Sequence, residues 1–284
     1  MRPRITASTR VAGVVGQPVR HSLSPVIHNA WIDRAGLDAV YLAFEPGRDR
    51  FASLVDGLRG GGVVQGLNVT LPFKEDALAL ADEASAAAAR SGAANRLLFR
   101  PDGSVEADNS DGQGLLDALQ SAGFEAPGRR IVVLGAGGAS RGAVLALLDA
   151  GAAEIAVVNR SAERALAIAA LDPRVSADGW GSLDRLLDGS DAVINATSLG
   201  MAGQPRLELS LDAAPKSAVV MDMIYRPLET ELLATARRRG HPTADGLAML
   251  IGQAAPSYQA FFNRPPPADV DVRALCEAAL AVRP

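Results

Sequence analysis

The sequence contains little cysteine and little histidine, and these shortages exclude two kinds of site. Cys276 is the single cysteine among 284 residues, so neither an intrachain disulfide nor a cysteine-based metal cluster can form, and a reducing compartment is expected. The three histidines, His21, His28 and His241, have no carboxylates around them at ligand spacing. We therefore predict no metal site.

Long apolar runs and an excess of positive charge are absent as well. No stretch approaches the roughly 18 consecutive apolar residues that a membrane span requires. Because 28 basic residues face 32 acidic ones, the net charge of -4 offers no cationic field for nucleic acid or an anionic membrane. The basic first ten residues lack the apolar core of a targeting signal, and we expect a short disordered arm. These absences favour a soluble, cytoplasmic protein whose partner is a small molecule. We expect it to be a monomer or homodimer.

Strand and helix patterns alternate along nearly the whole sequence, which is typical of an α/β fold with parallel sheets, and 284 residues suffice for two domains. The first part predicts strands at 11–15, 40–44 and 63–69, helices at 25–35, 51–59 and 75–90, and an edge hairpin of 96–99 with 105–107. The second part predicts helices at 112–122, 183–187, 229–238, 247–262 and 270–282, and strands at 131–134, 154–158, 192–195 and 218–221.

The segment from Arg130 to Ser161 contains a strand, a glycine turn, a helix and a second strand, which is the order of a dinucleotide-binding unit. Gly135, Gly137 and Gly138 directly follow the first strand. Glycine allows the tight turn and the close approach of the backbone to a pyrophosphate, whose negative charge the N-terminus of the following helix attracts. The segment thus predicts a dinucleotide site in a doubly wound, Rossmann-type domain.

The residues after the second strand favour NADP over NAD. An NAD site usually has an acid here that binds the ribose 2′-hydroxyl, but this sequence has Asn159, Arg160 and Ser161. A guanidinium without a neighbouring carboxylate suits a 2′-phosphate, and Arg164, one helical turn later, can add to the same pocket. The alternative is that both arginines are solvated residues at the start of a helix. We predict NADP as the cofactor.

Polar residues upstream of the glycine turn suggest a substrate site. Ser22 and Ser24 precede a predicted helix that has Pro25 in its first turn, and two hydroxyls beside a helix N-terminus suit a carboxylate. The alternative is that Ser24 is the N-cap of this helix, which leaves Ser22 without a role. The two serines are therefore a candidate carboxylate clamp.

Four more polar residues stand where predicted elements meet. Thr70 and Lys74 follow the strand 63–69, and ligands bind at the carboxyl ends of strands in α/β folds. Asn95 and Asp111 flank the hairpin. Each has an ordinary alternative, because a lone lysine is usually a solvated surface charge and Asp111 can cap the helix that follows it.

Seven motifs together resemble one enzyme family. Over residues 11–262 the sequence is similar to shikimate dehydrogenase in the ordered motifs HSLSP, NVTLPFK, DNSDG, GAGGASRG, NRS, DMIYRP and ADGLAMLIGQA. The resemblance implies a discontinuous substrate domain, residues 1–110 plus 246–284, and a Rossmann NADP domain, residues 111–245, with the active site in the cleft between them. It also implies that NADP is used to interconvert shikimate and 3-dehydroshikimate in chorismate and aromatic amino-acid biosynthesis.

The resemblance further implies roles for single residues. The substrate carboxylate would be held by Ser22, Ser24 and Tyr225. The ring hydroxyls would be surrounded by Thr70, Lys74, Asn95, Asp111 and Gln253, of which Lys74 and Asp111 would handle the proton that accompanies the hydride. The cofactor would be held by Gly135, Ala136, Gly137, Gly138, Ala139, Asn159, Arg160, Ser161 and Arg164, with Gly246 and Met249 beside the nicotinamide. Met249 can alternatively be a core residue.

The sequence departs from the family pattern beside Asn95. Arg96 stands where the family usually has threonine, and strand alternation predicts that its side chain faces away from Asn95. Ser110 also replaces a threonine and keeps the hydroxyl. Two alternatives stay open: a relative that acts on quinate or an amino-substituted analogue, and a non-catalytic NADP-binding regulator. Lys74 and Asp111 argue against the regulator, because a protein that only binds has no chemical need for both.

Overall fold

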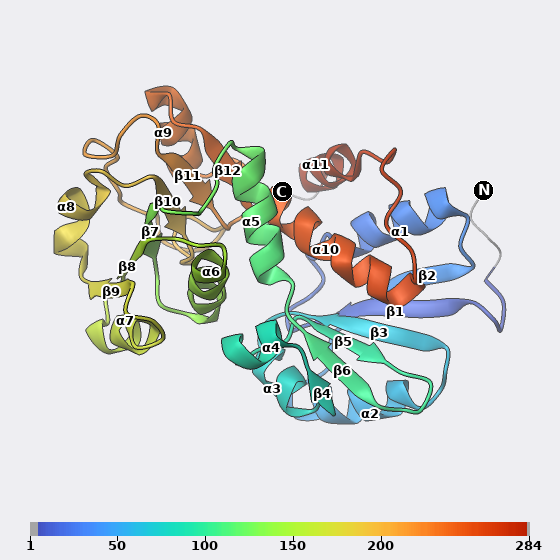
Figure 1. Cartoon of the computed structure of the whole chain (residues 1–284). Coiled ribbons are helices and arrows are strands. Elements are labelled where there is room, and N and C mark those ends of the chain that lie inside the picture. The colour runs from blue at the N-terminus through green and yellow to red at the C-terminus, as the bar shows by residue number, and fades with distance from the viewer. Residues whose placement is uncertain (1–4, 283–284) are drawn as a thin grey trace. The chain divides into compact units, whose positions relative to one another are not determined.

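The computed structural model describes residues 5–282, which form two compact units (Figure 1). The first unit contains the residues up to Ser110 and those from Gln253 onward, and the second unit contains Asp111–Gly252. The second boundary therefore falls inside helix α10 (Gly246–Phe262), whereas the resemblance implied a boundary at its first residue. The reason is that the first turn of α10 still packs against the core of the second unit through Ala248 and Met249.

Of the expected amino-terminal arm, residues 1–4 lie outside the described residues. The part that is described is held by Asp38, which directly precedes β2 (Ala39–Phe44). Thr9 is buried, and its hydroxyl donates to Asp38 Oδ1 at 2.6 Å, while the hydroxyl of Ser8 donates to Oδ2 at 3.3 Å. The prediction of a disordered arm is therefore wrong for residues 6–9, because the hydroxyls of Thr6, Ser8 and Thr9 bind a carboxylate that is distant in the sequence.

The first unit contains a six-stranded mixed sheet in the order β2-β1-β3-β5-β6-β4. β1 (Arg10–Val15) pairs in parallel with both β2 and β3 (Val64–Val69). β5 (Arg96–Phe99) and β6 (Val105–Asp108) form the predicted hairpin, and β5 is antiparallel to β3. The hairpin does not form the edge of the sheet, because the short strand β4 (Glu83–Ala84) pairs with β6 beyond it.

Helices cover both faces of this sheet (Figure 1). On one face, α2 (Phe51–Arg59), α3 (Lys74–Ala79) and α4 (Ala86–Ser91) bury apolar side chains against the strands. On the other face lie α1 (Ser24–Ala35), the later part of α10, and α11 (Val272–Val282), which contacts α1. His28 of α1 is fully buried among aromatic rings there, and burial lowers its pKa to about 3, so its ring is neutral.

The single helix predicted over residues 75–90 is wrong. The chain forms α3, the strand β4 and α4 instead. Alanine favours a helix locally, but the open edge of β6 needs hydrogen-bond partners. Asp82 supplies them to Val105: its backbone N donates at 2.9 Å, and its carboxylate accepts from Val105 N at 2.8 Å. Ser85 then starts α4 by accepting a hydrogen bond from Ala88 N at 3.1 Å.

The second unit contains six parallel strands in the order β12-β11-β10-β7-β8-β9. Their bounds are β7 (Arg130–Leu134), β8 (Glu154–Val158), β9 (Val175–Asp178), β10 (Ala192–Asn195), β11 (Val219–Asp222) and β12 (Thr243–Asp245). This is the doubly wound order, in which β7 and β10 are neighbours although two strands separate them in the chain. β9 and β12 were not predicted, because they are short and partly polar.

The strands of the second unit are buried on both faces, which explains their apolar sequences. Ile131 and Val133 pack toward α5 (Asp111–Ser121) and α6 (Gly138–Asp149), whereas Val132 and Leu134 pack toward α8 (Leu183–Leu187) and α9 (Glu231–Arg239). α7 (Ala162–Ala169) contributes Ala165 and Ile168 to the first of these two cores. No helix within residues 5–282 has the length and hydropathy that a membrane crossing requires.

Candidate active site

Strand directions in the first unit bring four segments together at one end of its sheet. The last residues of β1 and β3, Val15 and Val69, are partners in register because the two strands are parallel. β5 is antiparallel to β3 and begins at the same end, where Val69 N donates to Asn95 O at 2.8 Å. β6 returns to that end, and Asn95 N donates to Asp108 O at 3.0 Å. We call this region the polar end of the first sheet.

Ser22 and Ser24 lie between β1 and α1. The helix begins at Ser24, Leu23 occupies the capping position, and no side chain caps the helix, so the alternative in which Ser24 is the N-cap is wrong. Ser22 Oγ accepts a hydrogen bond from Ser24 N at 3.3 Å. Both hydroxyls therefore lie at the positive dipole end of a 12-residue helix, a position that favours an anion.

Thr70 and Lys74 lie at the polar end of the first sheet. Thr70 follows β3, and its backbone N donates to Val15 O at 2.9 Å. Lys74 is the first residue of α3, and its carbonyl accepts from Ala94 N at 2.8 Å, which places the start of α3 beside Asn95. Both residues are half-buried, so Lys74 is not a fully solvated surface lysine.

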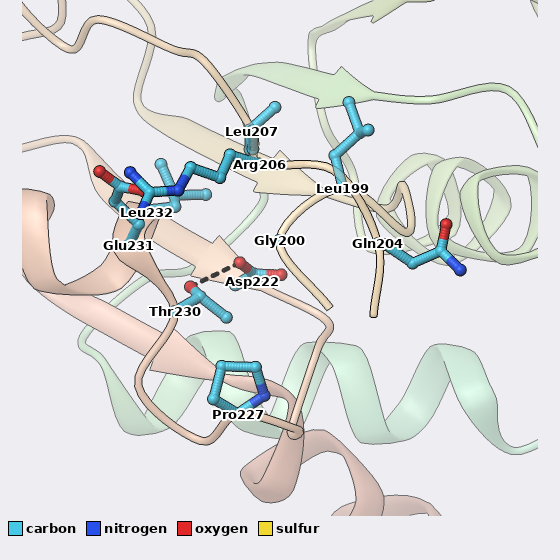
Figure 2. A pocket seen from close by; sticks show the side chains of 10 residues that line it. All are labelled: Leu199, Gly200, Gln204, Arg206, Leu207, Asp222, Pro227, Thr230, Glu231 and Leu232. Carbon is cyan, nitrogen blue, oxygen red and sulfur yellow. Dashed lines mark hydrogen bonds and ion pairs between the residues drawn. The ribbon is translucent and has the colours of Figure 1, made fainter. Parts of the chain in front are cut away.

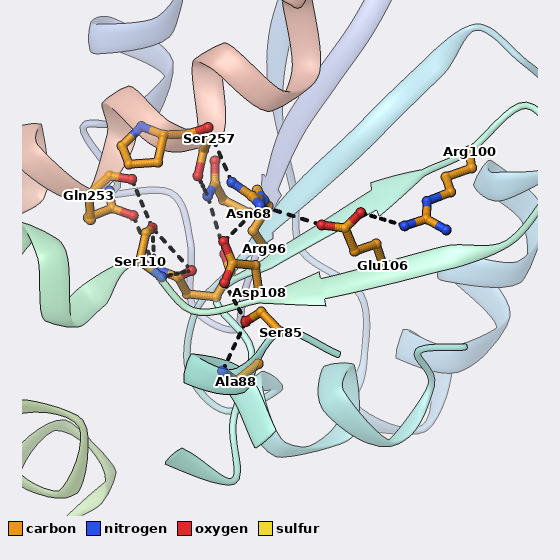
Figure 3. Close-up of polar contacts among 12 residues, drawn as sticks. Asn68, Ser85, Ala88, Arg96, Arg100, Glu106, Asp108, Ser110, Gln253 and Ser257 are labelled. Atoms are coloured by element: carbon orange, nitrogen blue, oxygen red, sulfur yellow. Dashed lines mark hydrogen bonds and ion pairs between the residues drawn. The ribbon is translucent and has the colours of Figure 1, made fainter. Parts of the chain in front are cut away.

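Asn95 forms a compact hydrogen-bonded group with Ser110 and Gln253, which are both labelled in Figure 3. Asn95 Nδ2 donates to Gln253 Oε1 at 3.3 Å and to Ser110 Oγ at 3.1 Å. Asn95 Oδ1 accepts from Ser110 N at 2.9 Å, and Ser110 Oγ donates to Gln253 O at 3.0 Å. Two of the predicted substrate residues, 158 positions apart in the chain, are thus in direct contact.

Arg96 is directed at β6 and α10 (Figure 3). Its Nη2 lies 2.7 Å from Asp108 Oδ2 and 3.9 Å from Glu106 Oε1, and its Nη1 donates to Pro256 O at 3.2 Å. Only 9% of the Arg96 side chain is exposed. The guanidinium is therefore held in a buried ion pair, whereas the side chain of Asn95 binds Ser110 and Gln253.

Three buried polar residues that the sequence analysis did not select connect these groups. Tyr41 of β2 donates through its hydroxyl to Asn68 Oδ1 at 2.8 Å. Asn68 Nδ2 donates to Ser257 Oγ at 2.8 Å and to Asn95 O at 3.2 Å. A signal for Asn68 was present, because Asn68 and Thr70 are alternate residues of the NVTLPFK motif and an asparagine inside a buried strand needs partners. Tyr41 and Ser257 carry no such signal.

The glycine turn of the second unit is open at the N-terminus of α6. Gly135 has φ 103°, and a Cβ there would lie 2.9 Å from Thr197 Cγ2, so this position requires glycine. A Cβ at Gly137 or Gly138 would meet nothing within 4 Å, and no side chain caps α6. Ala136 is half-buried and Ala139 is exposed. The free N–H groups and open approach fit the pyrophosphate of a dinucleotide.

The segment after β8 lies beside this turn, because Gly135 N donates to Val158 O at 2.8 Å. Asn159 Nδ2 donates to Ser161 O at 3.0 Å. Arg160 and Arg164 are exposed, so their guanidinium groups are accessible to a phosphate. The acid at the end of the neighbouring strand, Asp178, is ion-paired with Arg185 at 2.9 Å.

Of the other predicted residues in the second unit, two begin helices, one lies inside a helix and one lies in a loop. Asp111 is the first residue of α5, not the residue before it. A Cβ on Gly246, which begins α10, would lie 2.3 Å from Met223 O, so the position excludes any side chain. Met249 is partly buried and packs against the core, in agreement with its alternative role. Tyr225 is half-buried in the loop after β11.

A cavity of about 210 Å³ lies beside β11, between residues 199–207 and 227–232 (Figure 2). Asp222 in its wall accepts hydrogen bonds from Thr230 Oγ1 at 2.7 Å, Asn195 Nδ2 at 3.0 Å and Ile224 N at 3.1 Å, and burial raises its pKa. These bonds tie the loop that carries Tyr225 to the sheet. None of the predicted site residues lines this cavity.

Comparison with known proteins matches both units to one family. Residues 14–97 match the model of the shikimate dehydrogenase substrate binding domain, and residues 118–222 match that of shikimate / quinate 5-dehydrogenase. The curated shikimate dehydrogenase (NADP(+)) of Caulobacter vibrioides is 54% identical over 278 residues, which are 97% of each chain.

Solved structures agree with this match over nearly the whole chain. A shikimate 5-dehydrogenase from Thermus thermophilus, in complex with NADP(H) and shikimate, has a TM-score of 0.83 and 34% identity, covering 95% of this chain and 98% of that one. A quinate dehydrogenase from Corynebacterium glutamicum, in complex with NAD, has a TM-score of 0.85 and 29% identity, covering 96% and 99%. Because a curated relative is 54% identical over nearly the whole chain and both family models match in order along the sequence, the chain belongs to the shikimate dehydrogenase family.

Proposed function

We propose that the chain catalyses the reversible, NADP-dependent oxidation of shikimate to 3-dehydroshikimate, a step of chorismate and aromatic amino-acid biosynthesis. The supporting observation is the polar end of the first sheet, which combines the serine clamp, Thr70, Lys74 and the amide pair Asn95 and Gln253. Hydroxyl, amine and amide groups in one place suit a small acid that carries several hydroxyls. The first unit then binds the substrate, and the second unit binds NADP.

Different residues bind different groups of the substrate. Ser22 and Ser24, with the N-terminus of α1 behind them, hold its carboxylate, and Tyr225 adds a hydroxyl. Thr70, Asn95 and Gln253 bind the ring hydroxyls. Asn95 and Gln253 already orient each other, so little side-chain entropy is lost when substrate binds.

Lys74 and Asp111 handle the proton. Oxidation of an alcohol releases a hydride and a proton, and bound NADP supplies the hydride acceptor. The remaining requirement is a group at the reacting oxygen that accepts the proton and returns it during ketone reduction. A lysine amine can do both, and a carboxylate partner orients its N–H groups. The backbone of α3 supports Lys74 through the hydrogen bond between its carbonyl and Ala94.

Arg160 is expected to select NADP over NAD. For Arg160→Ala we expect kcat/KM for NADP to fall about tenfold to a hundredfold while the value for NAD stays unchanged, because a charge-assisted hydrogen bond to the 2′-phosphate contributes about 1.5–3 kcal/mol. Initial rates at 340 nm with each cofactor measure the ratio. Arg238→Ala is the control, since Arg238 is also exposed but lies on α9, where it binds Thr235. An unchanged NADP/NAD ratio in Arg160→Ala would remove Arg160 from the cofactor site.

The rival substrate is quinate, which a structural relative of this chain is named for. Initial rates with NADP and either shikimate or quinate test the proposal. We expect kcat/KM for shikimate to exceed that for quinate by at least tenfold. A preference for quinate would replace the proposed substrate, and no reduction of NADP with folded protein would favour a non-catalytic, cofactor-binding role.

We further propose that the enzyme acts in the cytoplasm as a monomer or homodimer. Cys276 is a free, buried thiol, which is consistent with a reducing compartment. Light scattering of the purified protein measures the oligomeric state.

A further inference from the structure

We infer that Ser257 is a positioning residue for the substrate: its buried hydroxyl fixes helix α10 against β3, so that the side chain of Gln253 meets that of Asn95. This inference rests on the proposed function, in which Gln253 and Asn95 bind ring hydroxyls. Ser257 lies on α10 but outside the ADGLAMLIGQA motif and every other motif that marks the family in this sequence.

The hydroxyl of Ser257 joins α10 to the central part of the first sheet. Ser257 is fully buried, and its Oγ accepts a hydrogen bond from Asn68 Nδ2 of β3 at 2.8 Å; both residues are labelled in Figure 3. A buried hydrogen bond between side chains of two elements restricts how one element can slide or rotate against the other. Because Gln253 precedes Ser257 by four residues on the same face of the helix, fixing Ser257 also fixes the position from which the Gln253 side chain extends.

The amide of Asn68 also holds the segment that carries Asn95. Asn68 Nδ2 donates a second hydrogen bond, to Asn95 O at 3.2 Å, and Asn68 Oδ1 accepts from the hydroxyl of Tyr41 at 2.8 Å. The amide therefore cannot turn without losing a partner. Asn95 Nδ2 in turn donates to Gln253 Oε1 at 3.3 Å. Ser257, Asn68, Asn95 and Gln253 thus form a closed ring of contacts, in which the Ser257 hydroxyl sets the distance between α10 and Asn95.

A proline weakens the helix close to Gln253. Pro256 lies inside α10, and because proline has no N–H, the helix lacks one internal hydrogen bond in this turn. Two other side chains bind the helix backbone here: Ser110 Oγ donates to Gln253 O at 3.0 Å, and Arg96 Nη1 donates to Pro256 O at 3.2 Å. Both contacts remain when the Ser257 hydroxyl is removed, so we expect α10 to shift on the sheet without detaching from it.

The test is Ser257→Ala, with Tyr258→Phe as the matched control. Each substitution removes one buried hydroxyl from the same helix, but that of Tyr258 donates to the backbone carbonyl of Trp31, at 3.3 Å, which belongs to no predicted site. For Ser257→Ala we expect KM for shikimate to rise about threefold to tenfold, with kcat and KM for NADP unchanged. For Tyr258→Phe we expect wild-type values of KM for both substrates. A merely structural role of Ser257 would reduce the amount of active enzyme, which lowers kcat and leaves both KM values unchanged.

A second comparison tests whether Ser257 acts through Gln253. If it does, Ser257→Ala added to Gln253→Ala should lower kcat/KM for shikimate no further than Gln253→Ala alone, because no amide side chain is then left to position. Additive losses, or a wild-type KM for shikimate in Ser257→Ala, would overturn the inference. Failure of the proposed function is distinguishable, because the wild-type protein itself would then not oxidise shikimate.

Discussion

Replacing Lys74 by alanine is expected to lower kcat for shikimate oxidation by a factor of about 10²–10⁴, the usual contribution of a positioned acid or base. NADP binding should not change, because the cofactor residues lie on the second unit whereas Lys74 begins α3 of the first. Initial rates at 340 nm give kcat, and quenching of NADPH fluorescence gives the cofactor affinity. The effect should be largest near the pH optimum, where proton transfer to and from the substrate oxygen is most efficient.

The sequence supplies a close control for Lys74. The chain contains two lysines, and the other, Lys216, is exposed in the second unit. Lys216→Ala should retain wild-type turnover. Lys74→Arg keeps the positive charge but stays protonated at every working pH, so it should orient substrate without exchanging a proton and should remain nearly inactive. Near-normal turnover in Lys74→Ala would remove Lys74 from the chemistry, and high activity in Lys74→Arg would limit its role to charge.

Replacing Arg96 by alanine is expected to destabilise the first unit by about 3 kcal/mol. The substitution leaves the carboxylate of Asp108, which is 22% exposed, without its cation, and it removes the donor to the carbonyl of Pro256. The free energy of unfolding in urea measures the loss. We expect a loss of stability at the lower end of the range for broken buried ion pairs, because Asp108 also accepts a hydrogen bond from Ser85, at 2.5 Å.

An exposed ion pair in the same unit is the control for Arg96. Arg34 and Asp269 are paired with 59% and 56% of their side chains exposed, so Arg34→Ala should cost less than about 1 kcal/mol. Combining Arg96→Met with Asp108→Asn should recover much of the loss, because no buried charge is then left unpaired. If Arg96→Ala and Arg34→Ala lower the free energy of unfolding equally, the buried ion pair of Arg96 contributes no more to stability than an exposed one.

Arg96 also bears on substrate choice, because it stands beside Asn95. Its guanidinium is bound to Asp108 and Pro256, so we expect Arg96→Thr to leave the ratio of kcat/KM for shikimate and quinate unchanged even if the protein is less stable. A change in this ratio would mean that Arg96 contributes to recognition of the ring hydroxyls.

Local sequence was sufficient to predict elements that are buried on both faces or that contain turn-forming residues such as glycine. The order of strand, glycine turn, helix and strand from Arg130 to Val158 was predicted, and the two strands were placed within one residue, because apolar runs and glycines are read directly. Local sequence failed over residues 75–90, where alanine favours a helix but pairing with β6 breaks it. It also missed β9 and β12, whose strand conformation depends on a neighbouring strand.

The candidate site, too, was predicted only in part from the sequence. Lys74, Asn95 and Gln253 were selected through motifs, yet nothing in their spacing says that Asn95 and Gln253 touch. That contact exists because β5 runs antiparallel to β3 and α10 packs over both. Tyr41 and Ser257 were missed because a buried tyrosine or serine has the same appearance in a sequence whether or not it joins two parts of a site.

The sequence by itself determined the family, the α/β class, the NADP preference and the residues offered for chemistry, since these depend on residue types at short spacing. Only the tertiary structure decided which of them meet, that Arg96 forms an internal ion pair with Asp108, and that Tyr41 of β2 binds Asn68 of β3. The physical reason is that hydrogen bonds and ion pairs depend on distance and burial. Both are produced by strand order and helix packing between segments that are remote along the chain.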